Sequence, residues 1–172
     1  MTTSVDVCNA IADVVAKLWP DRMIYRDFCP ADHNRPSSFL YIVQSGFEPA
    51  NVSLVEWSME AELELFCATD EYDISSTEEL RKDQESVLLA FGAPSLKVGD
   101  RYVTLLALGD GAELGSAFVK FTASWFDQQP GYHDPDDMND PVSAAVPKMM
   151  DFECNRDFTA LPSDERTNLD KG

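Results

Sequence analysis

Three glutamates alternate with apolar residues in one stretch of the sequence. Residues 56–67 read EWSMEAELELFC. In an extended strand, Glu60, Glu62 and Glu64 share one face, and the residues between them share the other. Successive residues on one face lie roughly 6.5–7 Å apart, so the carboxylates form a ladder about 13 Å long. Such a ladder is compatible with a metal site, a catalytic pair, a repulsive surface or an ordinary solvated strand face.

The ladder alone is a poor catalytic arrangement. General acid–base catalysis needs carboxylates in unlike environments, with the pKa of one raised by burial. Three equivalent glutamates on an open sheet face share one environment. The opposite face is apolar and is predicted to belong to the core; it consists of Trp57, Met59, Ala61, Leu63 and Leu65.

Other residues with catalytic or metal-binding chemistry are sparse. His33 and His133 are the only histidines. Cys29 and His33 (CPADH) have a ligand-like spacing, but no second pair completes a metal site. The acidic stretch 133–137 lacks the central glycine and the distal glutamate of a calcium loop. No phosphate-binding glycine loop or nucleophile motif occurs. The sequence therefore predicts a protein that is not an enzyme, with no catalytic residues, no cofactor and no metal.

The charge of the chain limits its partners. Its 172 residues include 31 acidic and 13 basic side chains, a formal net charge of −18. Specific binding of free nucleic acid is unexpected, because phosphate contacts need clustered Lys and Arg. No apolar run is long enough to span a membrane, and the N-terminus lacks the pattern of a signal peptide. The four scattered cysteines are predicted to be free thiols in a reducing compartment.

The periodicity predicts an α+β domain over residues 1–126. A first helix begins after Thr3, with Asp6 completing a capping box, and stops before Pro20. A second helix follows Ser76 over residues 77–91. Strands are predicted at 23–26, 38–44, 55–68, 101–108 and 116–126. We expect a mainly antiparallel sheet of about four to five strands, covered by the two helices.

Residues 127–172 are different in composition. They contain eleven acidic and four basic residues and five prolines. Too little apolar surface is present to offset the entropy of ordering, so an extended acidic C-terminal arm is predicted. Only the stretch 142–152 has apolar density. Its predicted anchors to a neighbouring subunit are Val146, Met149, Met150 and Phe152.

The order of these elements resembles the tail terminator (tail completion) proteins of long-tailed bacteriophages. The resemblance covers roughly residues 4–126. It rests on a short helix running into Trp19-Pro20-Asp21, a strand with Ile24-Tyr25, the proline-preceded strand 36–43, the alternating strand 57–67, the helix at 77–91 and a closing strand ending in Trp125-Phe126.

The resemblance implies a structural virion protein that has no catalytic activity. Proteins of this family form a ring, usually a hexamer, on the head-proximal end of the tail tube. The ring stops tube polymerisation and docks to the head-completion or connector proteins. The expected location is the virion neck, after assembly in the host cytoplasm. Double-stranded DNA passes through the channel without specific binding, and a ring of glutamates facing it would repel the phosphates.

Two other functions remain compatible with the sequence. A head-closure protein occupies an adjacent layer of the neck and would share many of these patterns. A small acidic inhibitor that mimics DNA and occupies a host enzyme would also carry a high negative charge. The alternation of residues does not fix which face of the predicted sheet looks into a channel. The glutamates could equally lie on the solvated outside of such a ring.

Overall fold

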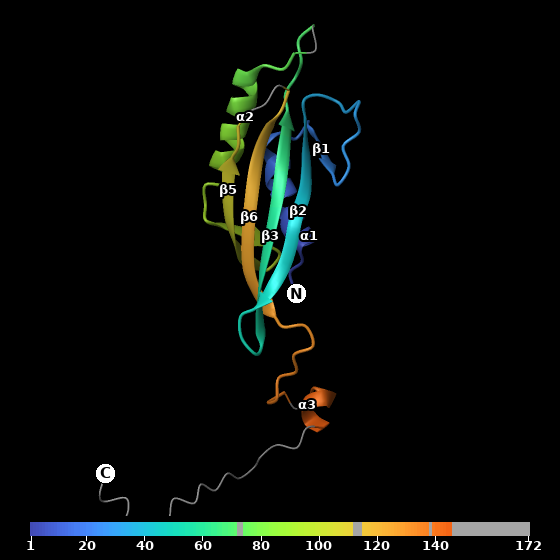
Figure 1. Cartoon of the computed structure of the whole chain (residues 1–172), viewed down its shortest axis with the longest axis vertical. Helices are drawn as coiled ribbons and strands as arrows, with labels where there is room; N and C mark the ends of the chain where they lie inside the picture. The colour runs from blue at the N-terminus through green and yellow to red at the C-terminus, as the bar shows by residue number, and fades with distance from the viewer. Residues whose placement is uncertain (72–73, 112–114, 138, 146–172) are drawn as a thin grey trace, which may run out of the picture. The chain divides into compact units, whose positions relative to one another are not determined.

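The computed structural model describes residues 1–71, 74–111, 115–137 and 139–145. It divides the chain into two units, residues 1–132 and residues 133–172. The first unit contains a sheet and two long helices (Figure 1). The helices are α1 (Ser4–Leu18) and α2 (Thr77–Ala90). The strands are β1 (Met23–Arg26), β2 (Ser37–Pro49), β3 (Leu54–Phe66), β4 (Ser95–Val98), β5 (Arg101–Gly109) and β6 (Ala117–Gln128).

The six strands form one sheet in the order β1-β2-β3-β6-β5-β4. β1 runs parallel to β2, whereas every other neighbouring pair is antiparallel. The α+β class is therefore confirmed, but the sheet is mixed and has more strands than the four to five predicted. The additional strand is β4, which pairs with β5 across a tight turn where Gly99 adopts a positive φ of 60°. A left-handed conformation of this kind suits glycine because it has no Cβ.

Local sequence signals determine where α1 begins. The Thr3 side chain accepts a hydrogen bond from the Asp6 N–H, and the Asp6 carboxylate accepts one from the Thr3 N–H in return. This is the predicted capping box, which satisfies two N–H groups that lack helical partners. Ser76 caps α2 in the same position, accepting from the Glu79 N–H at 3.4 Å. α1 ends at Leu18, before the proline at position 20.

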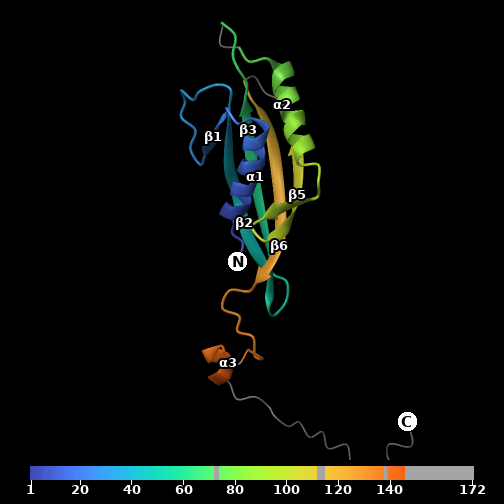
Figure 2. The ribbon, with the colours of Figure 1, turned by 180° about the vertical axis from the view of Figure 1, so that it is seen from behind.

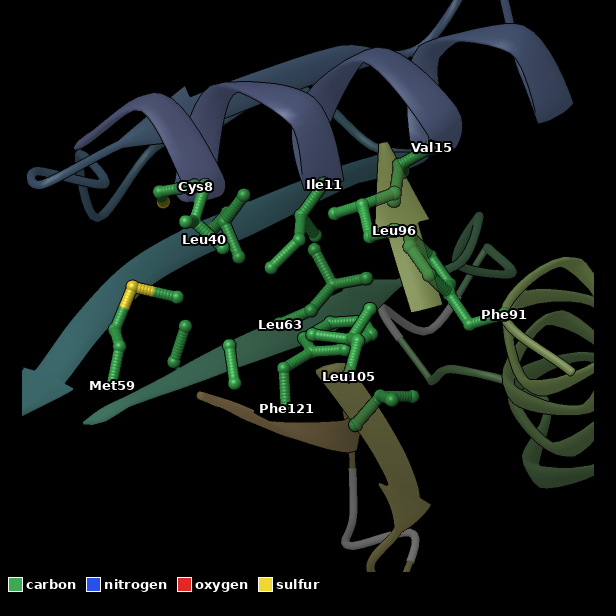
Figure 3. Close-up of a cluster of buried hydrophobic side chains, with 14 of the residues drawn as sticks. Cys8, Ile11, Val15, Leu40, Met59, Leu63, Phe91, Leu96, Leu105 and Phe121 are labelled. Atoms are coloured by element: carbon green, nitrogen blue, oxygen red, sulfur yellow. The ribbon is translucent and has the colours of Figure 1, made fainter. Parts of the chain in front are cut away.

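Both long helices cover the same face of the sheet (Figure 2). Ile11 of α1 and Val87 of α2 belong to one hydrophobic cluster with Leu63 of β3. Figure 3 shows Ile11 and Leu63 within this cluster. The predicted core face of β3 is confirmed at Met59, Ala61, Leu63 and Leu65, which are all at most 1% exposed. Trp57 is half-buried and stacks on Trp125 at a centroid distance of 5.9 Å. The period-two alternation thus identified the core side correctly.

The end of the first unit differs from the predicted boundary at residue 126. β6 continues to Gln128, and Asp127 is 8% exposed. Its carboxylate accepts a hydrogen bond from the Thr2 N–H at 2.7 Å and lies 3.4 Å from the Arg101 guanidinium. These contacts join the start of the chain to the last strand. Asp127 is therefore part of the sheet domain.

The second unit is described over residues 133–137 and 139–145. It contains a short helix, α3 (Pro141–Ala145). The Asp140 carboxylate accepts hydrogen bonds from the Val142 N–H and the Ser143 hydroxyl and pairs with His133. The predicted anchors Val146, Met149, Met150 and Phe152 lie outside the described residues.

Candidate functional site

The candidate site is the face of the sheet opposite α1 and α2, which we call the outer face. In Figure 1 the strands lie in front of α1, so this face is turned toward the viewer. Its central strand is β3, where Glu60 is exposed and Glu62 and Glu64 are half-exposed. The three predicted ladder residues are thus together on one face. They are not in the core.

The register of the sheet places specific neighbours beside each glutamate. Glu62 lies between Tyr41 of β2 and Lys120 of β6. Glu64 lies between Phe39 and Phe118, and Glu60 between Gln44 and Thr122. A β-bulge at residue 43 shifts the β2 register between the Glu62 row and the Glu60 row. The ladder therefore has an aromatic half at Glu64 and a polar half at Glu60.

Tyr41 is the closest partner of the ladder. Its hydroxyl donates a hydrogen bond to Glu62 Oε2, and its ring stacks on Phe39 with centroids 4.8 Å apart. Burial raises the pKa of the Tyr41 hydroxyl, and the hydrogen bond to Glu62 and the charges of Glu62 and Glu64 raise it further. Tyr41 therefore stays protonated and orients the Glu62 carboxylate without neutralising it.

Lys120 is opposite Glu62 in register but does not pair with it. Its ammonium lies 2.6 Å from Asp110 Oδ2. This hydrogen bond and the charge of Asp110 raise the pKa of Lys120, with smaller contributions from Glu62 and Glu60. Among the described residues, the three ladder carboxylates of the outer face therefore form no ion pair with a lysine or arginine, although the Lys120 charge lies near Glu62 and Glu60.

The residues considered for metal binding do not assemble a site. His33 Nδ1 lies 3.1 Å from the Pro30 carbonyl oxygen, which can only accept, so this nitrogen carries the proton. The His33 ring packs on Phe66 at 4.1 Å, and Cys29 contacts the same Pro30 carbonyl. Burial raises the pKa of the Cys29 thiol, and the nearby charge of Glu64 adds to this effect. Cys29 is therefore a weak nucleophile and a weak ligand at neutral pH.

Carboxylates in the acidic stretch 133–137 accept hydrogen bonds from nearby backbone N–H groups. Asp134 accepts a hydrogen bond from the Asp136 N–H, and Asp137 accepts one from the Asn139 N–H. Such turns satisfy backbone donors locally. Over the residues that the structure describes, no group of three or more His, Cys, Asp or Glu side chains is placed to hold a metal ion.

The outer face also has an apolar part that the sequence analysis did not identify as functional. Tyr102, Leu106 and Leu108 of β5 are 68%, 54% and 54% exposed. They alternate with the buried Val103 and Leu105. The signal was present, because residues 102–108 read YVTLLAL, an apolar run on both faces of one strand. When one face of such a strand packs in the core, the apolar side chains of the other face remain exposed to solvent unless another surface covers them.

No helix within the described part of the chain is both long and apolar enough to cross a membrane. In comparisons with known proteins, the chain matches no protein-family model and no curated protein.

Proposed function

We propose that this chain is a structural subunit of a bacteriophage neck, resembling the tail terminator proteins. Six copies would form a ring on the head-proximal end of the tail tube, stop its polymerisation and dock to the head-completion or connector proteins. The host cytoplasm is the site of assembly and the virion neck the final location. The chain carries out no reaction in this role.

The observation that carries the proposal is the outer face. It bears a row of three carboxylates, about 13 Å long, and none of them forms an ion pair with a lysine or arginine of the described residues. A channel for double-stranded DNA requires a wall that does not retain phosphates, and like charges keep the duplex away from the wall. Neither long helix covers this face of the sheet, as Figure 1 shows.

The decisive experiment is imaging of an assembled neck at a resolution that identifies each chain. We expect this chain in six copies, directly above the last ring of tube protein, with β3 facing the lumen. A single copy, or a position outside the stack of rings, would contradict the proposal. A position in the layer next to the connector would instead assign the chain as a head-closure protein.

Substitution of the ladder tests the orientation of the outer face separately. Replacing Glu60, Glu62 and Glu64 with lysine would create a phosphate-binding collar, because bound phosphates release counterions. Virions carrying this variant should assemble and eject DNA slowly at low salt, and the defect should lessen as salt rises. Normal ejection at low salt would show that the ladder does not face the duplex. The triple glutamine variant is the matched control, since it removes charge without adding a cation.

A DNA-mimic inhibitor is the second candidate, and the regular spacing of the ladder favours it. Carboxylates roughly 6.5–7 Å apart on an open strand face resemble the repeat of phosphates along one nucleic-acid strand. Light scattering on the purified chain distinguishes the two functions. An inhibitor would remain a monomer or dimer and compete with DNA for its target enzyme, whereas rings support the neck protein.

A further inference from the structure

The part of β2 that extends beyond β1 is an uncovered edge of the sheet. β1 pairs with β2 only over Ser37–Leu40, whereas β2 pairs with β3 as far as Pro49. In Figure 1 the lower half of β2 has β3 on one side and no strand on the other. Within the described part of the chain, no backbone hydrogen bond joins residues 44–48 to a segment other than β3. We call the stretch 44–48 the β2 edge.

An uncovered strand edge exposes backbone groups that can bind another extended chain. Alternate residues of an edge strand direct their N–H and C=O groups away from the sheet, and an added strand satisfies them. Natural proteins block such edges with charged residues, prolines or bulges. Here a bulge at Val43 and the proline at position 49 lie at the two ends, but residues 44–47 between them are uncharged. The open stretch is about as long as an ordinary strand, roughly five residues.

The outer face beside the β2 edge contains a hollow. Gly46 has no side chain, and a Cβ added there would meet no atom within 4 Å. The register places Gly46 beside Ser58, and Gln44 beside Glu60. Together with Thr122, these residues line a hollow of about 230 Å³. The small residues thus leave an open path from the edge of the sheet to Glu60.

Three glutamates surround this hollow. Glu60 lines it, and Glu48 and Glu56 form the next row of the same face, roughly 6.5–7 Å along the strands. Glu48 and Glu56 are direct cross-strand partners, and like charges in such positions destabilise a sheet. Among the described residues, none of the three forms an ion pair with a lysine or arginine, and the nearby Lys120 is held by Asp110. All three glutamates would therefore attract a cation placed in the hollow from outside.

The opposite face of the β2 edge is apolar. Phe47 lies beside Trp57 in the register, on the face of the sheet that the helices cover, and the ring centroids are 4.8 Å apart. Phe47 is 46% exposed, so the helices leave its ring partly uncovered. A strand added at the β2 edge would place one of its own side chains beside this ring. The edge therefore fits a segment in which basic residues alternate with apolar ones.

We propose that the β2 edge binds an extended basic segment of another protein. The segment adds a strand beside β2, and one of its arginine or lysine side chains passes over Gly46 into the hollow, next to Glu60. Two strand spacings, about 10 Å, separate the added strand from β3, and an arginine and a glutamate side chain directed toward each other span this distance. The net charge of −18 favours a basic partner and opposes a second copy of this chain. The inference goes beyond the proposed function and does not depend on it.

The first test uses a synthetic peptide of about nine residues, the length of a long strand, in which arginine alternates with valine and threonine. Fluorescence anisotropy of the labelled peptide measures its binding to the full chain. We expect saturable binding with a Kd below about 1 mM, and weaker binding would overturn the inference. Two further peptides carry N-methyl groups on alternate backbone nitrogens, one set for each edge of the peptide strand.

The methylated peptides separate strand addition from attraction by charge. Only one edge of the added strand faces β2, so methylation of that edge should abolish binding and methylation of the other edge should not. All three peptides carry the same charge. If both methylated peptides bind like the parent, the attraction is one of charge alone and the inference is overturned.

Two substitutions in the chain test the hollow. Gly46→Val fills the path to Glu60, and Glu60→Gln removes the charge at its end. Each should weaken peptide binding at least about tenfold, the effect of roughly 1.4 kcal/mol. Gly111→Val and Glu85→Gln are the matched controls, because a Cβ at Gly111 also meets no atom within 4 Å and Glu85 is exposed on α2. Site variants that both bind like their controls would overturn the inference.

An NMR titration of the unmodified chain locates the contact without relying on a variant that folds. The amide signals of residues 44–48 should shift with the peptide, together with those of Ser58 and Glu60. Shifts confined to Glu62 and Glu64, or to the helices, would overturn the inference. Circular dichroism melts establish that the variants fold, and Gly46→Ser replaces Gly46→Val if that variant melts early. Failure of the peptide to bind would leave the neck proposal intact, because imaging of an assembled neck tests it separately.

Discussion

Replacing Asp127 with asparagine tests whether the last strand and the start of the chain are held together as the structure indicates. Asp127 Oδ2 accepts from the Thr2 N–H at 2.7 Å, and Oδ1 accepts from the Gln128 N–H at 2.9 Å. Asparagine has only one side-chain oxygen, so its amide nitrogen must face one of these two donors. The substitution also removes the charge that attracts Arg101, 3.4 Å away.

The magnitude follows from these contacts. A hydrogen bond to a charged group contributes about 1.5–3 kcal/mol, and leaving a buried donor unsatisfied costs about 1–3 kcal/mol. Since one of the two N–H bonds survives, we expect the free energy of unfolding to fall by about 1.5–3 kcal/mol at pH 7. Urea denaturation followed by circular dichroism measures it. Asp21→Asn, at an exposed position, is the matched control with the same change in charge.

The pH dependence gives an independent check. Burial by itself would raise the pKa of Asp127, but the N–H groups of Thr2 and Gln128 and the Arg101 charge outweigh it, so the pKa is lowered. A carboxylate with a lowered folded-state pKa contributes stability that is present above its unfolded pKa of about 3.9 and lost as the pH falls through the folded pKa. The difference between the unmodified chain and Asp127→Asn should therefore be constant from pH 7 to pH 5 and shrink at pH 3. A difference that is the same at all three pH values, or smaller than that of Asp21→Asn, would refute the reasoning.

Three further outcomes are expected. Leu63→Asp places an unpaired charge at a position that is 0% exposed. The cost should unfold a domain whose free energy of unfolding is about 5–15 kcal/mol. A soluble variant that melts cooperatively would contradict the assignment of Leu63 to the core. Replacing Glu60, Glu62 and Glu64 with glutamine should leave the melting temperature unchanged or slightly raised, because like charges are removed and the amide oxygen introduced at position 62 can still accept from Tyr41. Deleting residues 133–172 should leave the melt of the first unit unchanged but weaken assembly into necks, and normal head–tail joining by the truncated chain would exclude a role for the arm.

Local signals in the sequence predicted the elements well. The capping box of Thr3 and Asp6 depends on residues three apart, and the alternation in β3 depends on residues two apart. β4 was missed because four residues between two turns carry too little pattern to distinguish a strand from a loop. The parallel pairing of β1 with β2 was missed for a different reason. Strand pairing depends on contacts between segments, and a single segment does not contain that information.

The same distinction applies to the candidate site. The alternation placed the three glutamates on one face, and the structure confirms that placement. It could not show that Tyr41 would bond to Glu62, because that contact depends on the register of two strands and on a bulge at residue 43. The sequence also could not show that Asp127 belongs to β6 and not to the predicted acidic arm. Its partner Thr2 is 125 residues away, and only the folded chain brings the two together.

Three cations of the first unit pair with aspartates rather than with the ladder glutamates. Arg22 pairs with Asp83 at 2.5 Å and joins the turn between α1 and β1 to α2, and Arg101 pairs with Asp127 of β6. Lys120, which lies within the outer face, is held by Asp110 at 2.6 Å. Each of these cations is thus engaged by an aspartate outside the ladder. The uncovered strand β3, whose three glutamates form no ion pair among the described residues, is the observation on which the proposed ring around DNA rests.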